Sequence, residues 1–140
     1  MEKSIKRLNP GIWSLSNWKQ FFVIAGIWNF CYTVPALTMP KFYFYMMYGF
    51  ETVDFYKIYL NSVFFVAVGI FGIGYFIIAS DPPKHKGIIV LGIIGKTAVA
   101  GLFYYLYAID RVTFLPPMGG TGDLIFTGYY TYYLFKGPES

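Results

Sequence analysis

The stretch IIVLGIIGKTAVAGLFYYLYAI, residues 88–109, decides the fold of this chain. It has 22 residues and one charged side chain, that of Lys96, well inside it. At about 1.5 Å per residue, such a helix is about 33 Å long and can cross a hydrocarbon core of about 30 Å. A lysine at that depth costs about 2.5–3.5 kcal/mol on insertion scales. We therefore expect a transmembrane helix whose Lys96 faces polar groups or water inside a bundle.

The composition of the whole chain is that of a membrane protein. Its 140 residues are 56% hydrophobic, 23% aromatic and 13% charged, whereas soluble domains carry about 25% charged residues. A soluble domain this short buries too little surface to hide so many aromatic side chains. The net charge of +4 indicates basic ends that face anionic headgroups, and we expect no nucleic-acid partner. With one cysteine, Cys31, and one histidine, the chain has no Cys/His metal cage, and we predict no metal.

Three more segments are predicted to cross the membrane, at about 20–39, 55–79 and 118–136, in addition to 88–109. The expected fold is therefore all-α, a single domain over residues 1–140 built as a bundle of four transmembrane helices. Asp54 is placed to cap the second span, and Ser16 or Asn17 the first. Residues 41–57 hold too many aromatics for a free loop and are too short to span. We expect them to run along the membrane interface, with a re-entrant loop as the alternative.

The fourth span has an unusual start. Residues 124–135 supply only 12 residues, or about 18 Å of helix, so the chain must enter the membrane near Met118 to cross it. The sequence GGTGD, residues 119–123, would then lie at membrane depth. We expect irregular backbone there, buried in protein or lining a water-filled hollow, and ending in the Asp123 carboxylate.

The basic residues predict the orientation. Four spans place both termini and the turn at residues 80–87 on one side of the membrane. That side carries Lys3, Lys6, Arg7, Lys19, Lys84, Lys86 and Lys136, against Lys41, Lys57 and Arg111 on the other. By the positive-inside rule both termini are cytoplasmic, and the location we expect is the bacterial cytoplasmic (inner) membrane.

Lys96 and Asp123 are the two ionisable groups that we place at membrane depth. They could form a direct ion pair or one linked by water. By residue counting, however, Lys96 lies about 12 Å from the cytoplasmic end and Asp123 about 20 Å, and a lysine in a helix leans toward the N-terminus of that helix, away from Asp123. We therefore favour separate roles, with Asp123 capping the fourth helix and Lys96 reaching cytoplasmic-side carbonyls.

Three uncharged polar residues, Asn29, Asn61 and Thr97, are candidates to join Lys96 in a polar interior. Such side chains usually link membrane helices through hydrogen bonds, and we favour that role over a ligand pocket. A pocket would suit a quinone or a lipid headgroup, because the many tyrosines offer stacking surfaces and hydroxyl donors. Small residues that let helices approach closely are expected at Gly69, Gly72, Gly92, Gly95 and Gly101.

Several of these features together resemble the DoxX-like group of small four-helix bacterial membrane proteins. They are Asn29, Pro35 and Pro40 at the first hairpin, the sequence GIGYF before Asp81-Pro82, the pair Gly95-Lys96 and the pair Gly122-Asp123. The resemblance covers nearly the whole chain. It implies a membrane subunit beside sulfur- or quinone-linked redox proteins, and it carries no catalytic motif to this sequence.

We favour from sequence a non-catalytic accessory subunit of a larger membrane assembly, redox-linked and held by the glycine faces of the second and third spans. Its partners would be lipids and other membrane subunits or further copies of the chain. The alternative is a membrane protein that binds a quinone or a lipid near Lys96. The third hypothesis, a transporter component, would need oligomerisation, because so few polar residues line no pore alone.

Overall fold

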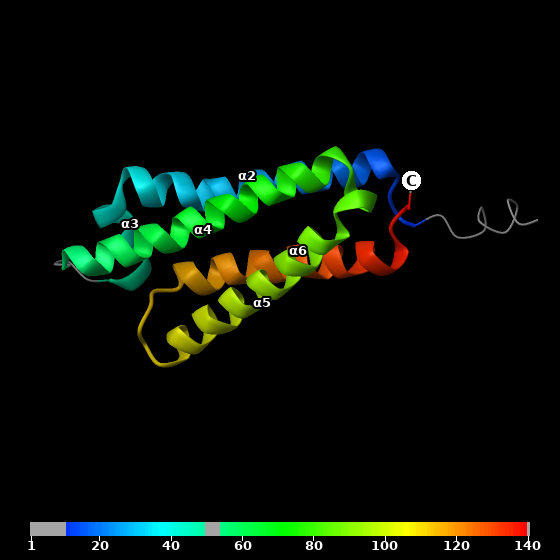
Figure 1. Ribbon diagram of the computed structural model, residues 1–140. Helices are drawn as coiled ribbons and strands as arrows, with labels where there is room; N and C mark the ends of the chain where they lie inside the picture. Colours follow the sequence, from blue (N-terminus) through cyan, green and yellow to red (C-terminus); the bar gives the residue numbers. More distant parts are fainter. Residues whose placement is uncertain (1–10, 50–53, 140) are drawn as a thin grey trace, which may run out of the picture.

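The computed structural model describes residues 11–49 and 54–139 (Figure 1). The described residues form helices and connecting turns, with no strand among them. In chain order the elements are α2 (Leu15–Thr38), α3 (Pro40–Tyr48), α4 (Phe55–Ser80), the short 3-10 helix η1 (Pro82–His85), α5 (Lys86–Ala108) and α6 (Leu115–Lys136). Three stretches are long and apolar enough to cross a membrane: Leu15–Thr38, Phe55–Ser80 and Pro82–Ala108.

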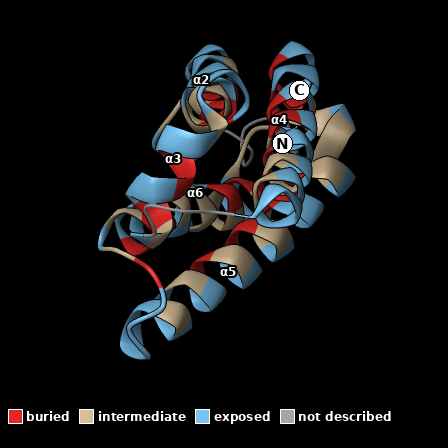
Figure 2. Cartoon of the chain, turned by 90° about the vertical axis from the view of Figure 1, so that its left-hand side faces the viewer, coloured by how far each residue is buried: buried red, intermediate tan, exposed pale blue. Residues whose placement is uncertain are grey.

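The long helices form two tight pairs. α2 packs along α4, and α5 packs along α6, whereas α4 and α5 touch over a much shorter length. Figure 1 shows α5 diverging from α4 as it runs away from η1. Buried residues lie on the sides of the helices that face one another, and the outer faces are exposed (Figure 2). Those outer faces carry large apolar side chains such as Ile24, Ile70 and Ile94, which suits contact with lipid.

Side chains of α2 hold the first pair together. Asn29 Nδ2 donates to the Val68 carbonyl at 2.9 Å, and Thr33 Oγ1 donates to the Phe65 carbonyl at 3.2 Å. A Cβ atom added at Gly69 would lie 3.0 Å from Thr33 Cγ2. Polar side chains of α2 reach the α4 backbone because glycine brings the two helices this close.

Two clusters close the ends of the molecule. At the end where α2 begins and α6 finishes, a mainly aromatic cluster contains Trp18, Phe22, Tyr75, Tyr130 and Tyr133, each at most 1% exposed. At the other end a smaller cluster joins α3 to α2 and α4 through Ala36, Tyr43, Met47 and Phe65. The candidate site lies between them.

The N-terminal half differs from the expected boundaries in two places. α2 begins at Leu15, five residues before the predicted start, because Ser14 caps it by accepting the Asn17 N–H at 3.3 Å. The predicted caps Ser16 and Asn17 are therefore wrong. The expected interfacial segment is in part the helix α3, which begins at Pro40 and ends at Tyr48. Gly49 follows it with a positive φ of 74°, a conformation that favours glycine. Residues 50–53 lie outside the described residues.

The second half of the chain confirms one prediction and corrects another. Asp54 caps α4, as expected, by accepting the Tyr56 N–H at 3.3 Å. The predicted irregular backbone at residues 119–123 is wrong, because α6 is helical from Leu115 onward, with prolines in its first turn. The prolines suit a first turn, where no intrahelical N–H bond is lost. A Cβ added at Gly120 would lie 3.2 Å from Ala100 Cα, so this glycine permits close packing with α5 and does not break the helix.

Candidate functional site

The side chains of Lys96 and Asp123 form an ion pair in the middle of the molecule. Lys96 lies on α5 and Asp123 on α6, and Lys96 Nζ is 2.5 Å from Asp123 Oδ1. The Lys96 side chain is 6% exposed and that of Asp123 is 19% exposed. This is the one salt bridge found within residues 11–49 and 54–139.

The expectation of separate roles for these two residues is therefore wrong, for two reasons. Asp123 cannot cap α6, because it lies eight residues after Leu115, about 12 Å inside the helix. Lys96 lies ten residues after the start of α5, about 15 Å in. Because α5 and α6 run in opposite directions, these two depths bring the two residues close to the same level. The lysine side chain can span the distance that remains between them along the helix axes. In an apolar interior the cost of leaving either charge unpaired outweighs the usual lean of a helical side chain.

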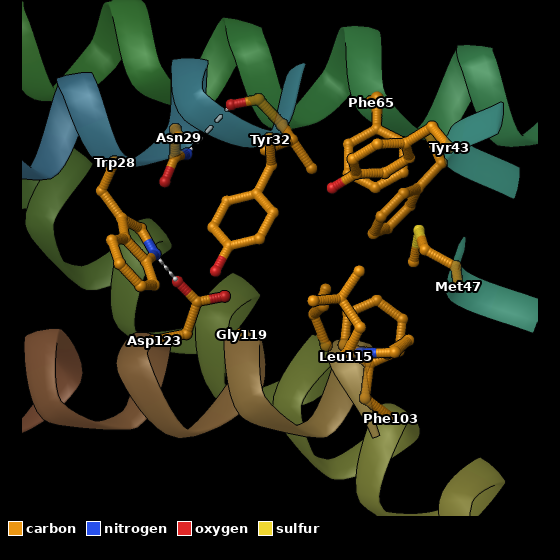
Figure 3. Close-up of a pocket in the computed structure, with 14 residues that line it drawn as sticks. Trp28, Asn29, Tyr32, Tyr43, Met47, Phe65, Phe103, Leu115, Gly119 and Asp123 are labelled. Carbon is orange, nitrogen blue, oxygen red and sulfur yellow. Dashed lines mark hydrogen bonds between the residues drawn. The ribbon is translucent and has the colours of Figure 1, made fainter. Parts of the chain in front are cut away.

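Two neighbouring residues of α2 complete the hydrogen bonds of the pair. Asn29 Oδ1 accepts from Lys96 Nζ at 3.0 Å, and Trp28 Nε1 donates to Asp123 Oδ1 at 3.1 Å (the second bond is drawn in Figure 3). Asn29 is 5% exposed and is held in turn by the Val68 carbonyl of α4. Helices α2, α5 and α6 therefore supply the side chains of the hydrogen-bonded site, and α4 supports it through the bond from Asn29 to the Val68 carbonyl.

Aromatic rings surround the charges. Lys96 Nζ lies 5.3 Å from the centre of the Tyr75 ring and 5.5 Å from that of Phe126, within the range of a cation–π attraction. Tyr32 directs its hydroxyl toward Asp123 (Figure 3). None of these rings was among the site residues expected from sequence, and neither was Trp28. A signal existed for Trp28, which lies mid-span, whereas membrane tryptophans usually gather at the interfaces.

An apolar crevice opens beside the ion pair, between the two helix pairs. It consists of two adjoining cavities. Their volumes are about 450 and 470 Å³ when the open space in front of each is included. Both are lined by Asn29, Phe64, Val68, Val99 and Asp123. The first runs from Asp123 toward α3 and is lined by Tyr32, Tyr43, Phe65 and Phe103, among others (Figure 3). The second reaches Lys96. We use "the crevice" for these two cavities together.

The other predicted polar residues do not join Lys96. Asn61 is buried nearer the start of α4, where its Oδ1 accepts from the Tyr48 hydroxyl at 3.4 Å. Thr97 is exposed on the outer side of α5. Of the five candidate polar residues, the structure therefore brings together Lys96, Asp123 and Asn29.

The predicted glycines differ in what surrounds them. An added Cβ would lie 3.0 Å from Phe30 at Gly72, 2.9 Å from Tyr75 at Gly92, and 3.5 Å from Phe71 at Gly95. Together with Gly69, which faces Thr33, these four glycines face side chains of this same chain. Gly101 is exposed, and an added Cβ there would meet nothing within 4 Å.

In the part of the chain that the structure describes, no group of three or more His, Cys, Asp or Glu side chains is placed to hold a metal ion. Comparisons with protein-family models, curated proteins and solved structures find no match to this chain. The geometry therefore defines the class of site: a charge-neutral, hydrogen-bonded ion pair that lines an apolar crevice, in a helical protein with three helices able to cross a membrane.

Proposed function

We propose that this protein binds an uncharged, ring-bearing amphiphile in the crevice, with the polar head of the ligand against Lys96 and Asp123. The observation that carries the proposal is the position of the ion pair, which lines an otherwise apolar and aromatic cavity. Binding pockets typically combine apolar and aromatic walls with a few well-placed polar groups. A membrane quinone has the matching chemistry, since it pairs carbonyl acceptors with a flat ring and an apolar tail.

The charges at the site favour an uncharged head. Lys96 and Asp123 balance each other, and Asn29 and Trp28 are already bonded to them. A charged headgroup in the crevice would add an unpaired charge to an apolar interior, which is costly. An ammonium has three donors, and two of those of Lys96 are used by Asp123 and Asn29. A carbonyl oxygen can take the third without disturbing the pair.

The proposed setting is a bundle of four transmembrane helices in a bacterial cytoplasmic membrane, with both termini cytoplasmic. The proposal that α6 is the fourth span rests on its 22 residues, about 33 Å of helix, and on its packing along α5. The orientation is supported by Lys19, Lys84, Lys86 and Lys136, which belong to the end where α2 begins and α6 finishes (Figure 1). Because quinones carry electrons between membrane redox proteins, a quinone-binding bundle agrees with the redox-linked role that we expect from sequence.

Filling the crevice tests ligand binding. Val68 lines both cavities, whereas Val66, two residues earlier on α4, is 47% exposed on the outer surface. We expect Val68→Phe to weaken binding of a ubiquinone analogue with a decyl tail at least about tenfold, and Val66→Phe to leave it unchanged. Binding is measured in detergent as saturable quenching of tryptophan fluorescence, since Trp28 lines the crevice. Equal affinities for the two variants, or no saturable quenching by the wild type, would contradict the proposal.

An accessory subunit, the function that we favour from sequence, is the second candidate. The glycines of α4 and α5 that we expected to hold a partner face side chains of this chain, with the exception of Gly101. The observation in favour of a partner is the outer face of α5, where Thr97, Ala98 and Gly101 are all exposed. Such small side chains allow another helix to pack closely.

The two functions are separated by Gly101→Leu. Leucine at this position has room in the isolated chain but would hold a neighbouring helix away. If the chain is an accessory subunit, a partner that co-purifies with the wild type in mild detergent should be lost from this variant, while quinone-analogue binding persists. A wild-type chain that is monodisperse and solitary in the same detergent would count against the accessory role.

A further inference from the structure

A third cavity adjoins the crevice, where α3, α4 and α5 meet. Its volume is about 740 Å³ when the open space in front of it is included. It is lined by Phe44, Tyr48, Lys57, Leu60, Asn61, Phe64, Leu102, Phe103 and Leu106. Three of these side chains are polar, and all three belong to the end of the molecule where α4 begins. The others are apolar. The cavity thus has a polar end, which we call its mouth, and apolar walls.

Asn61 is the first indication that the mouth takes a ligand. It is 7% exposed, and its Oδ1 accepts from the Tyr48 hydroxyl. Among the described residues, its amide nitrogen donates no hydrogen bond. In the described part of the chain, the fully enclosed side-chain polar atoms without a partner are Trp18 Nε1 and Tyr130 Oη, and the Asn61 nitrogen is not one of them. Asn61 lines the cavity, and an amide nitrogen has two donors to offer, so a hydrogen-bond acceptor placed in the cavity can accept from it.

Lys57 is the second indication. It lies four residues before Asn61 on α4, and side chains at this spacing share one face of a helix. Its ammonium forms no ion pair within the described residues. The nearby Asp54 caps the helix by accepting the Tyr56 N–H. Lys57 and Asn61 therefore present a positive charge and neutral N–H donors at one mouth, which is the combination that binds an anionic oxygen group.

The walls of the cavity suit a hydrocarbon chain. Leu60 and Phe64 follow Lys57 along α4 toward the middle of the helix, and Leu102, Phe103 and Leu106 face them from α5. The separation between residues 57 and 64 on α4 is about 10 Å. A chain that starts at Lys57 and lies between α4 and α5 therefore passes Asn61 and otherwise only apolar side chains over that length.

We propose that this third cavity is a binding site for one anionic phospholipid. Its phosphate group is held by Lys57 and Asn61, and one acyl chain lies between α4 and α5. An anionic phosphate accepts charge-assisted hydrogen bonds from an ammonium group and from N–H donors, and the cavity adds apolar walls for the acyl chain. This site adjoins the crevice, with which it shares Phe64 and Phe103, but it takes a charged headgroup at Lys57, so it goes beyond the proposed function.

The test measures lipid retention by native mass spectrometry of the protein in mixed micelles that contain phosphatidylglycerol or phosphatidylcholine. We expect the wild type to retain one phosphatidylglycerol in preference to phosphatidylcholine, and Lys57→Gln to lower that retention about fivefold, the usual upper value of an exposed ion pair. Asn61→Leu, which removes the amide donors, should also reduce it. Lys41→Gln is the matched control, because Lys41 is exposed and does not line the cavity.

Equal losses for Lys57→Gln and Lys41→Gln would show general charge attraction and would overturn the proposal. Equal retention of the two lipids by the wild type would overturn it as well. Val68→Phe, which fills the crevice, should leave phosphatidylglycerol retention unchanged. The failure of this site and the failure of the quinone site are therefore distinguishable.

Discussion

Replacing Lys96 with methionine is expected to lower the free energy of unfolding by about 3–5 kcal/mol, the usual cost of removing one partner of a buried ion pair. The change leaves the Asp123 carboxylate without its ammonium in an apolar interior, and it leaves Asn29 Oδ1 without a donor. Asp123→Leu should cost a similar amount, because it strands the Lys96 ammonium. Reversible unfolding in mixed detergent micelles, followed by circular dichroism, measures both losses.

The double variant Lys96→Met/Asp123→Leu separates the charge effect from packing. Apolar replacement of a whole buried pair is often close to neutral, so we expect the double variant to recover at least half of the stability lost by either single variant. Full recovery is not expected, because Trp28 Nε1 and Asn29 Oδ1 also lose their partners. If the two single losses simply add, the two side chains do not interact in the folded protein.

The same double variant gives the sharper test of the ligand site. In a single Lys96→Met variant, lost binding and lost stability would be confused, because the lysine is paired. A folded double variant that binds the quinone analogue as well as the wild type would rule out a role of the pair in holding the head of the ligand.

Replacing Gly72 with leucine is expected to have the second largest effect, a loss of about 1–3 kcal/mol or more through overpacking. A Cβ atom at this position would already lie 3.0 Å from the Phe30 ring and 3.2 Å from Asn29 Cβ. A leucine would therefore push α2 away from α4. Because Asn29 holds Lys96, the displacement should also weaken the candidate site.

Gly101→Leu is the matched control, since it makes the same change inside a helix at a position where an added Cβ meets nothing within 4 Å. Its effect on stability should stay within about 0.5 kcal/mol, as for most surface substitutions. Both variants are compared in the same unfolding measurement. Leucine is a better helix former than glycine, so equal losses would show that the contact of α2 with α4 does not govern the cost.

The sequence by itself determined the features that depend on local composition. Three of the long helices could be predicted within about five residues, because an uninterrupted apolar segment in a membrane has no alternative to helical hydrogen bonds. Lys96 and Asp123 could be selected for the same reason, since a charge within an apolar segment is costly wherever its partner lies. The cap at Asp54 required only the residue type and the segment that follows it.

Only the tertiary structure decided what those residues contact. The pairing of Lys96 with Asp123 depends on the register of α5 against α6, and counting residues from uncertain helix ends could not provide that register. Gly72 lies against α2 and Gly101 against nothing, although both are glycines in apolar helices, because the rotation of each helix about its axis follows from side-chain packing along the whole length of its neighbours. Trp28 and Tyr32 reach Asp123 for the same reason: residues far apart in the chain meet only once the helices have packed.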